Sequence, residues 1–84
     1  MTYLVVDFEA MCHEHSLPIP TEIGCCLIDE YGLVHNEPFF SELICPSEGT
    51  PSAYDIDLTG ITPSMLASAR SAEAVFSDLR ERCL

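Results

Sequence analysis

The chain has 84 residues, of which 48% are hydrophobic and 20% are charged, and its 14 acidic and 3 basic residues give a formal net charge of −11. This length bounds the chain to one small domain, residues 1–84, and the apolar content predicts a packed core rather than a disordered segment. The negative charge and the absence of Lys argue against autonomous binding to a phosphate backbone.

The cysteines and the first residues indicate a cellular compartment. Five cysteines are an odd number, and the adjacent Cys25 and Cys26 would point to opposite faces of a strand. This pattern favours free thiols in a reducing compartment over a disulfide framework. The first apolar run is interrupted by Asp7, which predicts neither a signal peptide nor a membrane span. We therefore expect a cytoplasmic protein that makes no membrane contact.

Three segments read as strands. Residues 3–8 form a short β-branched apolar run that ends in an acid, which is typical of a strand buried on both faces. A surface loop over 11–20 is expected next, because its prolines disfavour a helix. Residues 21–28 and 33–44, joined by a Gly-containing turn, predict a hairpin. Pro38 cannot donate to a ladder, so the return strand is expected to lie at an edge or to carry a bulge.

The second half of the chain reads as loop and helix. Residues 45–57 contain Pro, Gly and several Ser and Asp, which predicts a long loop. Thr62 followed by Pro63 predicts a short helix through residue 68, and Ser71 predicts the start of an amphipathic helix. The expected fold class is therefore α/β, with a three-stranded, mostly antiparallel sheet plus helices. A first strand that is apolar on both faces requires cover on both.

Asp7 and Glu9 are two residues apart at the end of the first strand. Period-two geometry points both carboxylates to one face of the sheet, where they can share a metal site. Mg²⁺ or Mn²⁺ suits hard oxygen ligands and leaves positions open for water and phosphate. The alternative, that the two acids close a strand and face solvent, is favoured when the pair is considered alone.

Three segments, taken in order, resemble a known family. Residues 5–12 (VVDFEAMC) resemble the first motif of the DEDDh 3′-to-5′ exonucleases, especially the histone-mRNA 3′-end exonuclease and enhancer-of-RNAi group. Residues 21–29 (TEIGCCLID) resemble the family's following strand, and residues 57–62 (DLTGIT) resemble its L-T-G-I-T segment before a helix. The resemblance implies the amino-terminal part of a ribonuclease H-like exonuclease fold.

The resemblance also implies two groups of site residues. Asp7 and Glu9 would be catalytic residues and ligands of a two-metal Mg²⁺ or Mn²⁺ site that hydrolyses phosphodiesters. The substrate-binding residues, beside the 3′-terminal nucleotide of single-stranded RNA or DNA, would be Ala10, Met11, Leu58, Thr59 and Gly60. Met11 replaces a Thr that is frequent in relatives, so a hydroxyl contact is lost there. For Leu58 and for Ile61, core packing is an equally weighted alternative.

The chain also departs from the family pattern. By resemblance, a third acid lies in a later segment and a fourth follows a general-base His in an H-x-x-x-x-D motif, and this sequence ends before either. Asp55, Asp57 and Asp78 come too early to replace them, and none of the three His residues lies in that motif. We therefore expect weak or no activity from the isolated chain. The alternative is a non-catalytic interaction module that self-associates as a homo-oligomer through exposed strand edges.

For the remaining histidines and arginines, an ordinary structural role is favoured over metal or phosphate binding. Residues 12–15 (CHEH) are rich in zinc-capable side chains, but their spacing matches no known zinc module, and solvated loop histidines are the better interpretation. For His35, an exposed or hydrogen-bonded structural role is favoured over a chemical one. Arg70, Arg80 and Arg82 are expected to form ion pairs with nearby acids rather than to contact phosphate.

Overall fold

The computed structural model describes residues 1–12 and 17–84, with the backbone alone for residues 35–38. Strands and helices follow one another in a mixed α/β order. The elements are β1 (Thr2–Met11), β2 (Ile19–Asp29), β3 (Val34–Cys45), α1 (Ala53–Thr59), α2 (Pro63–Ala67), β4 (Arg70–Ser71) and α3 (Ala72–Cys83). The α/β class predicted from the sequence is confirmed.

The sheet has the strand order β1-β2-β3-β4, in which the first three strands are antiparallel. The predicted hairpin is confirmed, and Gly32 takes a φ of 80° in its turn. The predicted bulge around Pro38 is also present, because the partner of β2 jumps from Phe40 to His35 while β2 advances from Cys25 to Leu27. The sequence did not predict the two-residue strand β4, which pairs with β3 in parallel.

Both long strands of the β1-β2 pair extend further than predicted. Met11 and Ile19 pair with each other, so the two ends of the expected loop over 11–20 belong to the ladder, namely Met11 and Ile19–Pro20. The register shifts between Glu9 and Ala10, where Glu9 faces Glu22 but Ala10 faces Pro20. The strand therefore accommodates Pro20 beside an irregularity, which is where a residue without an N–H is tolerated. His13 and His15 lie outside the described residues.

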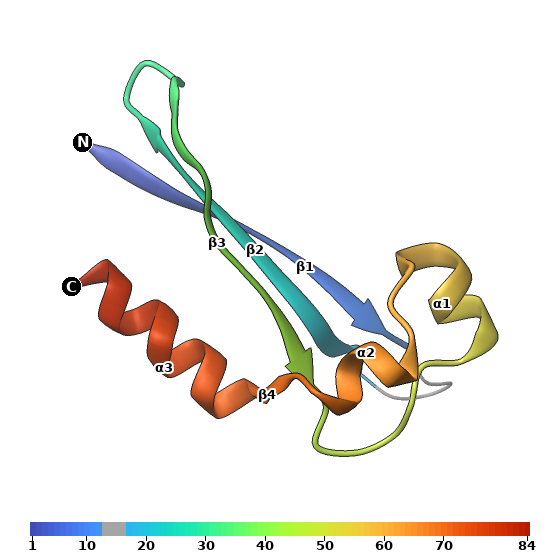
Figure 1. The fold of residues 1–84 in the computed structure, drawn as a ribbon. Coiled ribbons are helices and arrows are strands. Elements are labelled where there is room, and N and C mark those ends of the chain that lie inside the picture. The colour runs from blue at the N-terminus through green and yellow to red at the C-terminus, as the bar shows by residue number, and fades with distance from the viewer. Residues whose placement is uncertain (13–16) are drawn as a thin grey trace.

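The core lies between one face of the sheet and α3. Its buried members come from alternate positions of β2 and β3 and from the middle of the helix: Ile23, Cys25, Phe40, Ile44 and Val75. Figure 1 shows α3 running alongside the strands, while α1 and α2 gather near the end of β1. The amphipathic helix predicted from Ser71 is confirmed, with the Ser71 hydroxyl accepting a hydrogen bond from the Ala74 amide at 3.2 Å.

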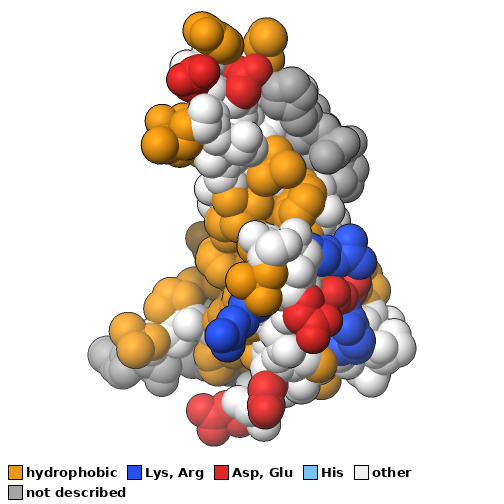
Figure 2. Space-filling view, turned by 90° about the vertical axis from the view of Figure 1, so that its left-hand side faces the viewer, with side chains coloured by type: hydrophobic (Ala, Val, Ile, Leu, Met, Phe, Trp, Pro, Cys, Tyr) orange, Lys and Arg blue, Asp and Glu red, His pale blue; other side chains and the backbone are white. Residues whose placement is uncertain are grey.

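The strand β1 remains exposed on both faces. Tyr3 and Val5, on the face away from α3, are 48% and 44% exposed, and Leu4 and Val6, on the other face, are 37% and 41% exposed. Figure 2 shows hydrophobic side chains gathered on the surface seen from the left of Figure 1. Among the described residues, no strand pairs with the outer edge of β1. The cover that the sequence requires for this strand does not come from these residues.

A helix occupies part of the segment predicted to be a loop. Helix α1 begins at Ala53, inside the segment 45–57 that was predicted to be a loop, and ends at Thr59. The Ser52 hydroxyl caps the amide of Asp55, and Asp55 returns a bond to the Ser52 amide, which is a reciprocal capping box. The loop prediction failed because the Pro and Gly residues before Ser52 outweighed this short capping pattern. In contrast, α2 begins at Pro63 behind the Thr62 cap, as predicted.

In the part of the chain that the structure describes, no helix has the length and hydrophobicity needed to cross a membrane.

Candidate active site

The strand β1 brings Asp7 and Glu9 to the same face of the sheet, the one opposite α3. Alternation along the strand places them with Tyr3 and Val5, and the antiparallel register sets Asp7 beside Gly24 and Glu9 beside Glu22. Asp7 is exposed and Glu9 is half-buried. The two carboxylates are therefore accessible from the side of the sheet that α3 leaves open.

Gly24 leaves space next to Asp7. A Cβ atom built on Gly24 would meet no atom within 4 Å, and its backbone φ is outside the left-handed region. Any other residue at this position would place a side chain next to the Asp7 carboxylate, because directly opposed side chains of an antiparallel pair share a face. The glycine thus keeps the surroundings of Asp7 open to an ion or a substrate group.

Glu22 is a third carboxylate on this face, and the sequence did not single it out. It lies directly across the strand pair from Glu9. Like charges in directly opposed positions destabilise a sheet unless a cation lies between or near them. Only the register between β1 and β2 shows that Glu22 lies opposite Glu9. The sequence alone does not give this register, because it shifts between Glu9 and Ala10.

The donor set formed by Asp7 and Glu9 suits a hard divalent cation in part. Two adjacent carboxylates at an exposed strand end offer oxygen ligands of the kind that Mg²⁺ and Mn²⁺ prefer, and they leave coordination positions open. Among the described residues, no group of three His, Cys, Asp or Glu side chains is placed to hold one metal ion. Asp7 and Glu9 can therefore supply part of a coordination sphere.

Ala10 and Met11 follow the acidic pair on the same strand. Ala10 is half-buried beside the register shift, whereas the Met11 side chain is 1% exposed and lies in the interior. Met11 as a whole residue therefore offers almost no surface to a ligand. The strand ends at this point, and the amide of Cys12 donates to the Asp55 carboxylate at 3.1 Å.

Leu58, Thr59 and Gly60 form the end of α1, which packs against β1. Leu58 is 69% exposed and Ile61 is 4% exposed, so core packing accounts for Ile61 but not for Leu58. The Thr59 hydroxyl donates to the Asp55 carbonyl at 2.8 Å and accepts from the Ile61 amide at 3.1 Å. Gly60 closes the helix at a φ of 76°. The Thr59 side chain thus shapes this turn, while Leu58 faces outward.

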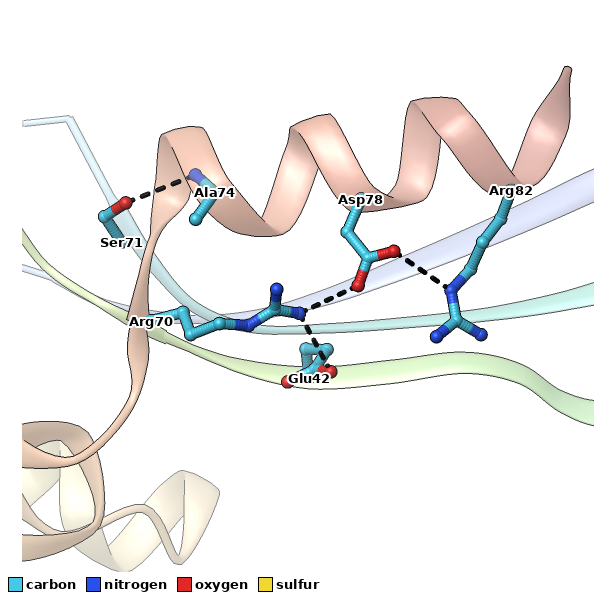
Figure 3. Close-up of polar contacts among 6 residues, drawn as sticks. All are labelled: Glu42, Arg70, Ser71, Ala74, Asp78 and Arg82. Carbon is cyan, nitrogen blue, oxygen red and sulfur yellow. Dashed lines mark hydrogen bonds and ion pairs between the residues drawn. The ribbon is translucent and has the colours of Figure 1, made fainter.

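Two basic residues near α3, Arg70 and Arg82, are engaged in ion pairs (Figure 3). Arg70 contacts Glu42 at 3.1 Å and Asp78 at 3.0 Å, and Arg82 contacts Asp78 at 3.2 Å. Hydrogen bonds from the two guanidinium groups lower the pKa of the Asp78 carboxyl below its usual value. The predicted ion pairing of Arg70 and Arg82 is confirmed. These contacts lie on the α3 face of the sheet, away from Asp7 and Glu9.

The buried thiol of Cys25 is not a nucleophile. All five thiols are free, with Cys12 and Cys83 exposed and Cys25 buried. Burial is the largest cause that raises the pKa of the Cys25 thiol above its usual value, and the nearby Cys83 and Cys26 add to it. A raised pKa keeps the thiol protonated and unreactive. Most of the zinc-capable segment 12–15 lies outside the described residues.

A sequence comparison decides the family. The exonuclease family model RNase_T matches residues 4–83. The chain belongs to this exonuclease family. The match spans all the site residues predicted above and extends through nearly the whole of α3. No curated protein sequence matches the chain.

Solved structures of exonucleases share the fold. The chain matches a full-length 3′-exonuclease with 22% identity and a TM-score of 0.83 over 95% of this chain and 28% of that one. It matches the nuclease domain of 3′hExo, a DEDDh family member bound to rAMP, with 25% identity and a TM-score of 0.81 over 95% and 42%. It also matches E. coli Exonuclease I in complex with a dT13 oligonucleotide, with 25% identity and a TM-score of 0.72 over 94% and 17%.

These matches confirm that the chain has a ribonuclease H-like exonuclease fold, and they place it among relatives of DEDDh 3′ exonucleases. The chain spans less than half the length of each of these three solved chains. The sheet with its open face corresponds to part of a larger nuclease fold.

Proposed function

We propose that this chain contributes to a metal-dependent 3′-to-5′ exonuclease that acts on single-stranded RNA or DNA ends. The observation that carries the proposal is the position of Asp7 and Glu9, which share one accessible face of β1 in a chain of the exonuclease family. Solved relatives bound to rAMP, to dT13 and to a histone mRNA stem-loop support a nucleic-acid 3′ end as the substrate class.

Electrostatics supports the dependence on metal. The chain has a net charge of −11, and the candidate face carries Asp7, Glu9 and Glu22. An acidic surface of this kind repels a phosphate unless cations neutralise it. Bound Mg²⁺ or Mn²⁺ would neutralise the two strand carboxylates and withdraw charge from a scissile phosphate. In this proposal Asp7 and Glu9 hold the ion, and the end of α1 contacts the terminal nucleotide.

The part of the nucleotide contact that this chain supplies combines side chain and backbone. The exposed Leu58 side chain offers an apolar surface for a base, and Gly60 allows a close approach of the main chain. Ala10 follows the acidic pair along β1, but its side chain lines a pocket with Phe8 and Phe76 on the α3 face. The five free thiols support a reducing compartment, and we propose the cytoplasm.

The test is cleavage of 5′-labelled single-stranded RNA and DNA with Mn²⁺. We expect slow stepwise shortening from the 3′ end, which stops when Mn²⁺ is removed by a chelator. Loss of a metal ligand removes several kcal/mol of charge stabilisation, so Asp7→Ala and Glu9→Ala should each slow the reaction on the order of 100-fold or more. Glu30→Ala is the matched control, because Glu30 is exposed at the far end of β1, 3.8 Å from the Met1 amino group.

Equal cleavage by Asp7→Ala and the unchanged chain would contradict the site assignment. Internal cuts in place of stepwise shortening would contradict the direction. An intact substrate in every reaction would favour a second candidate function, association with another chain through β1. The open outer edge of that strand and its exposed Leu4, Val5 and Val6 support this candidate.

A further inference from the structure

Asp55 is a buried carboxylate that joins two parts of the candidate site. It is 3% exposed. Its Oδ1 accepts a hydrogen bond from the Cys12 amide at 3.1 Å, across 43 residues of sequence. Its Oδ2 accepts from the Ser52 amide at 2.8 Å and from the Ser52 hydroxyl at 2.9 Å. One side chain thus holds the end of β1 and the beginning of α1 together.

The same residue also reaches the other end of the helix. The Asp55 carbonyl accepts from the Thr59 hydroxyl at 2.8 Å, and that hydroxyl accepts from the Ile61 amide at 3.1 Å. Helix α1 has only seven residues, so a constraint on its first turn also fixes its last turn. The hydrogen bonds of Asp55 therefore run from the strand of Asp7 and Glu9 to the turn of Leu58 and Gly60.

The burial of Asp55 makes this connection rigid. A carboxylate that is removed from water requires hydrogen bonds to its oxygens, and both oxygens of Asp55 receive them from groups on different elements. If either element moved away, a buried charge would lose a donor. The carboxylate thus favours one distance between β1 and α1 over others.

We propose that Asp55 is a positioning residue of the candidate site, which holds the Leu58–Gly60 turn at a fixed distance from Asp7 and Glu9. This inference rests on the proposed function, because only that function requires β1 and the Leu58–Gly60 turn to bind the same substrate. In the proposed complex, Asp7 and Glu9 hold the cation, and the turn contacts the nucleotide beside it. Asp55 touches neither the ion nor the nucleotide and acts through the backbone of Cys12 and through α1.

The test is paramagnetic broadening of backbone amide NMR signals by Mn²⁺, measured on the full 84-residue chain. Broadening falls steeply with distance from the ion, so its ratio between residues 58–60 and residues 6–10 reports how close the turn lies to the acidic pair. We expect broadening of both groups in the unchanged chain. In Asp55→Ala, the ratio should fall at least about twofold while residues 6–10 remain broadened.

Ser52→Ala is the matched control, because it removes the helix-capping hydroxyl with its bond to Oδ2 and leaves the Asp55 bonds to the amides of Cys12 and residue 52, which join β1 to α1. Its broadening ratio should equal that of the unchanged chain. Cys12→Pro reaches the same bond from the strand side by removing the amide hydrogen, and Pro is tolerated after an extended residue. It should lower the ratio as Asp55→Ala does, and it decides the question if Asp55→Ala fails to fold.

An unchanged ratio in folded Asp55→Ala, or in Cys12→Pro, would overturn the positioning role. A lowered ratio in Ser52→Ala would also overturn it, because loss of the cap alone would then explain the effect. Absence of broadening at residues 6–10 in the unchanged chain would instead contradict the metal site in the proposed function. The two failures are therefore distinguishable within one set of spectra.

Discussion

Two glycines near the candidate site serve different physical purposes. Gly60 ends α1 in the left-handed region, with a φ of 76°, and an added Cβ would meet no atom within 4 Å. A side chain at Gly60 is therefore disfavoured by backbone conformation and not by crowding. Gly24 has an ordinary strand conformation and leaves space beside Asp7.

Alanine substitutions should separate these two purposes. Gly60→Ala forces a Cβ into the left-handed region, so we expect it to lower the free energy of unfolding by roughly 1–2 kcal/mol. Gly24→Ala removes the flexibility of a glycine within a strand, and we expect it to raise the free energy of unfolding by roughly 0.5–1 kcal/mol. Urea denaturation measures both changes, and equal effects of the two variants would contradict this assignment.

The sequence predicts some site residues more fully than others. Period-two geometry predicts that Asp7 and Glu9 share a face of the sheet, and the regular register of β1 up to Glu9 places them on one face. The part played by Thr59 was not predictable, because its hydroxyl is used within the turn through a bond to the Asp55 carbonyl. Glu22 was also missed, because its position opposite Glu9 depends on pairing between strands. The roles of these residues toward metal and substrate stay predictions.

Among the elements, α3 is attached by both apolar and charged contacts. Val75 is fully buried against the sheet, and the Phe76 and Phe8 rings lie 6.2 Å apart between centroids. Asp78 accepts hydrogen bonds from Arg70, which precedes the helix, and from Arg82 one turn later. Because these bonds lower the pKa of Asp78 in the folded chain, folding is coupled to its ionisation.

The attachment of α3 should weaken in acid. The Asp78 carboxyl has a lower pKa folded than unfolded, so its contribution is present above the ordinary Asp pKa of about 3.9 and is lost as pH falls through the lower folded value. Urea denaturation between pH 6 and pH 3 should show a decline that Asp78→Asn makes shallower. Identical pH dependence in the two chains would contradict a role for this ion-pair cluster in stability.

The elements that the sequence predicts best are those with strong hydrophobic periodicity. The three long strands and α3 follow from such patterns, although β1 and β2 are longer than predicted. Helix α1 was missed because its seven residues lie behind Pro51, and its capping box uses Asp55 where Glu or Gln is usual. The two-residue strand β4 has no periodic signal, because it depends on pairing with the distant end of β3.

At the scale of the whole molecule, the sheet has one covered and one open face. Helix α3 covers the face with Ile23 and Phe40, whereas Tyr3, Val5 and Asp7 on the other face remain exposed. The chain spans 28% and 42% of two of the 3′-exonuclease chains whose fold it shares. The requirement for cover was predictable from the apolar residues of β1, but the identity of that cover was not.

The net charge of −11 governs how a metal site should be tested. A chain this acidic attracts cations without specific coordination, so the measurement needs moderate salt and a control of equal charge change. Asp7→Asn with Glu9→Gln removes two charges from the candidate site. Glu30→Gln with Glu48→Gln removes two charges from exposed positions outside β1.

Calorimetric titration of Mn²⁺ into these chains, at about 0.15 M salt, measures directly whether Asp7 and Glu9 bind a metal ion. Asp7 and Glu9 are the ligands in this account, so the Asp7→Asn, Glu9→Gln variant should bind Mn²⁺ at least about tenfold more weakly, which corresponds to about 1.4 kcal/mol. The Glu30→Gln, Glu48→Gln variant should bind it as the unchanged chain does. Equal affinity in all three chains would contradict a metal site on β1.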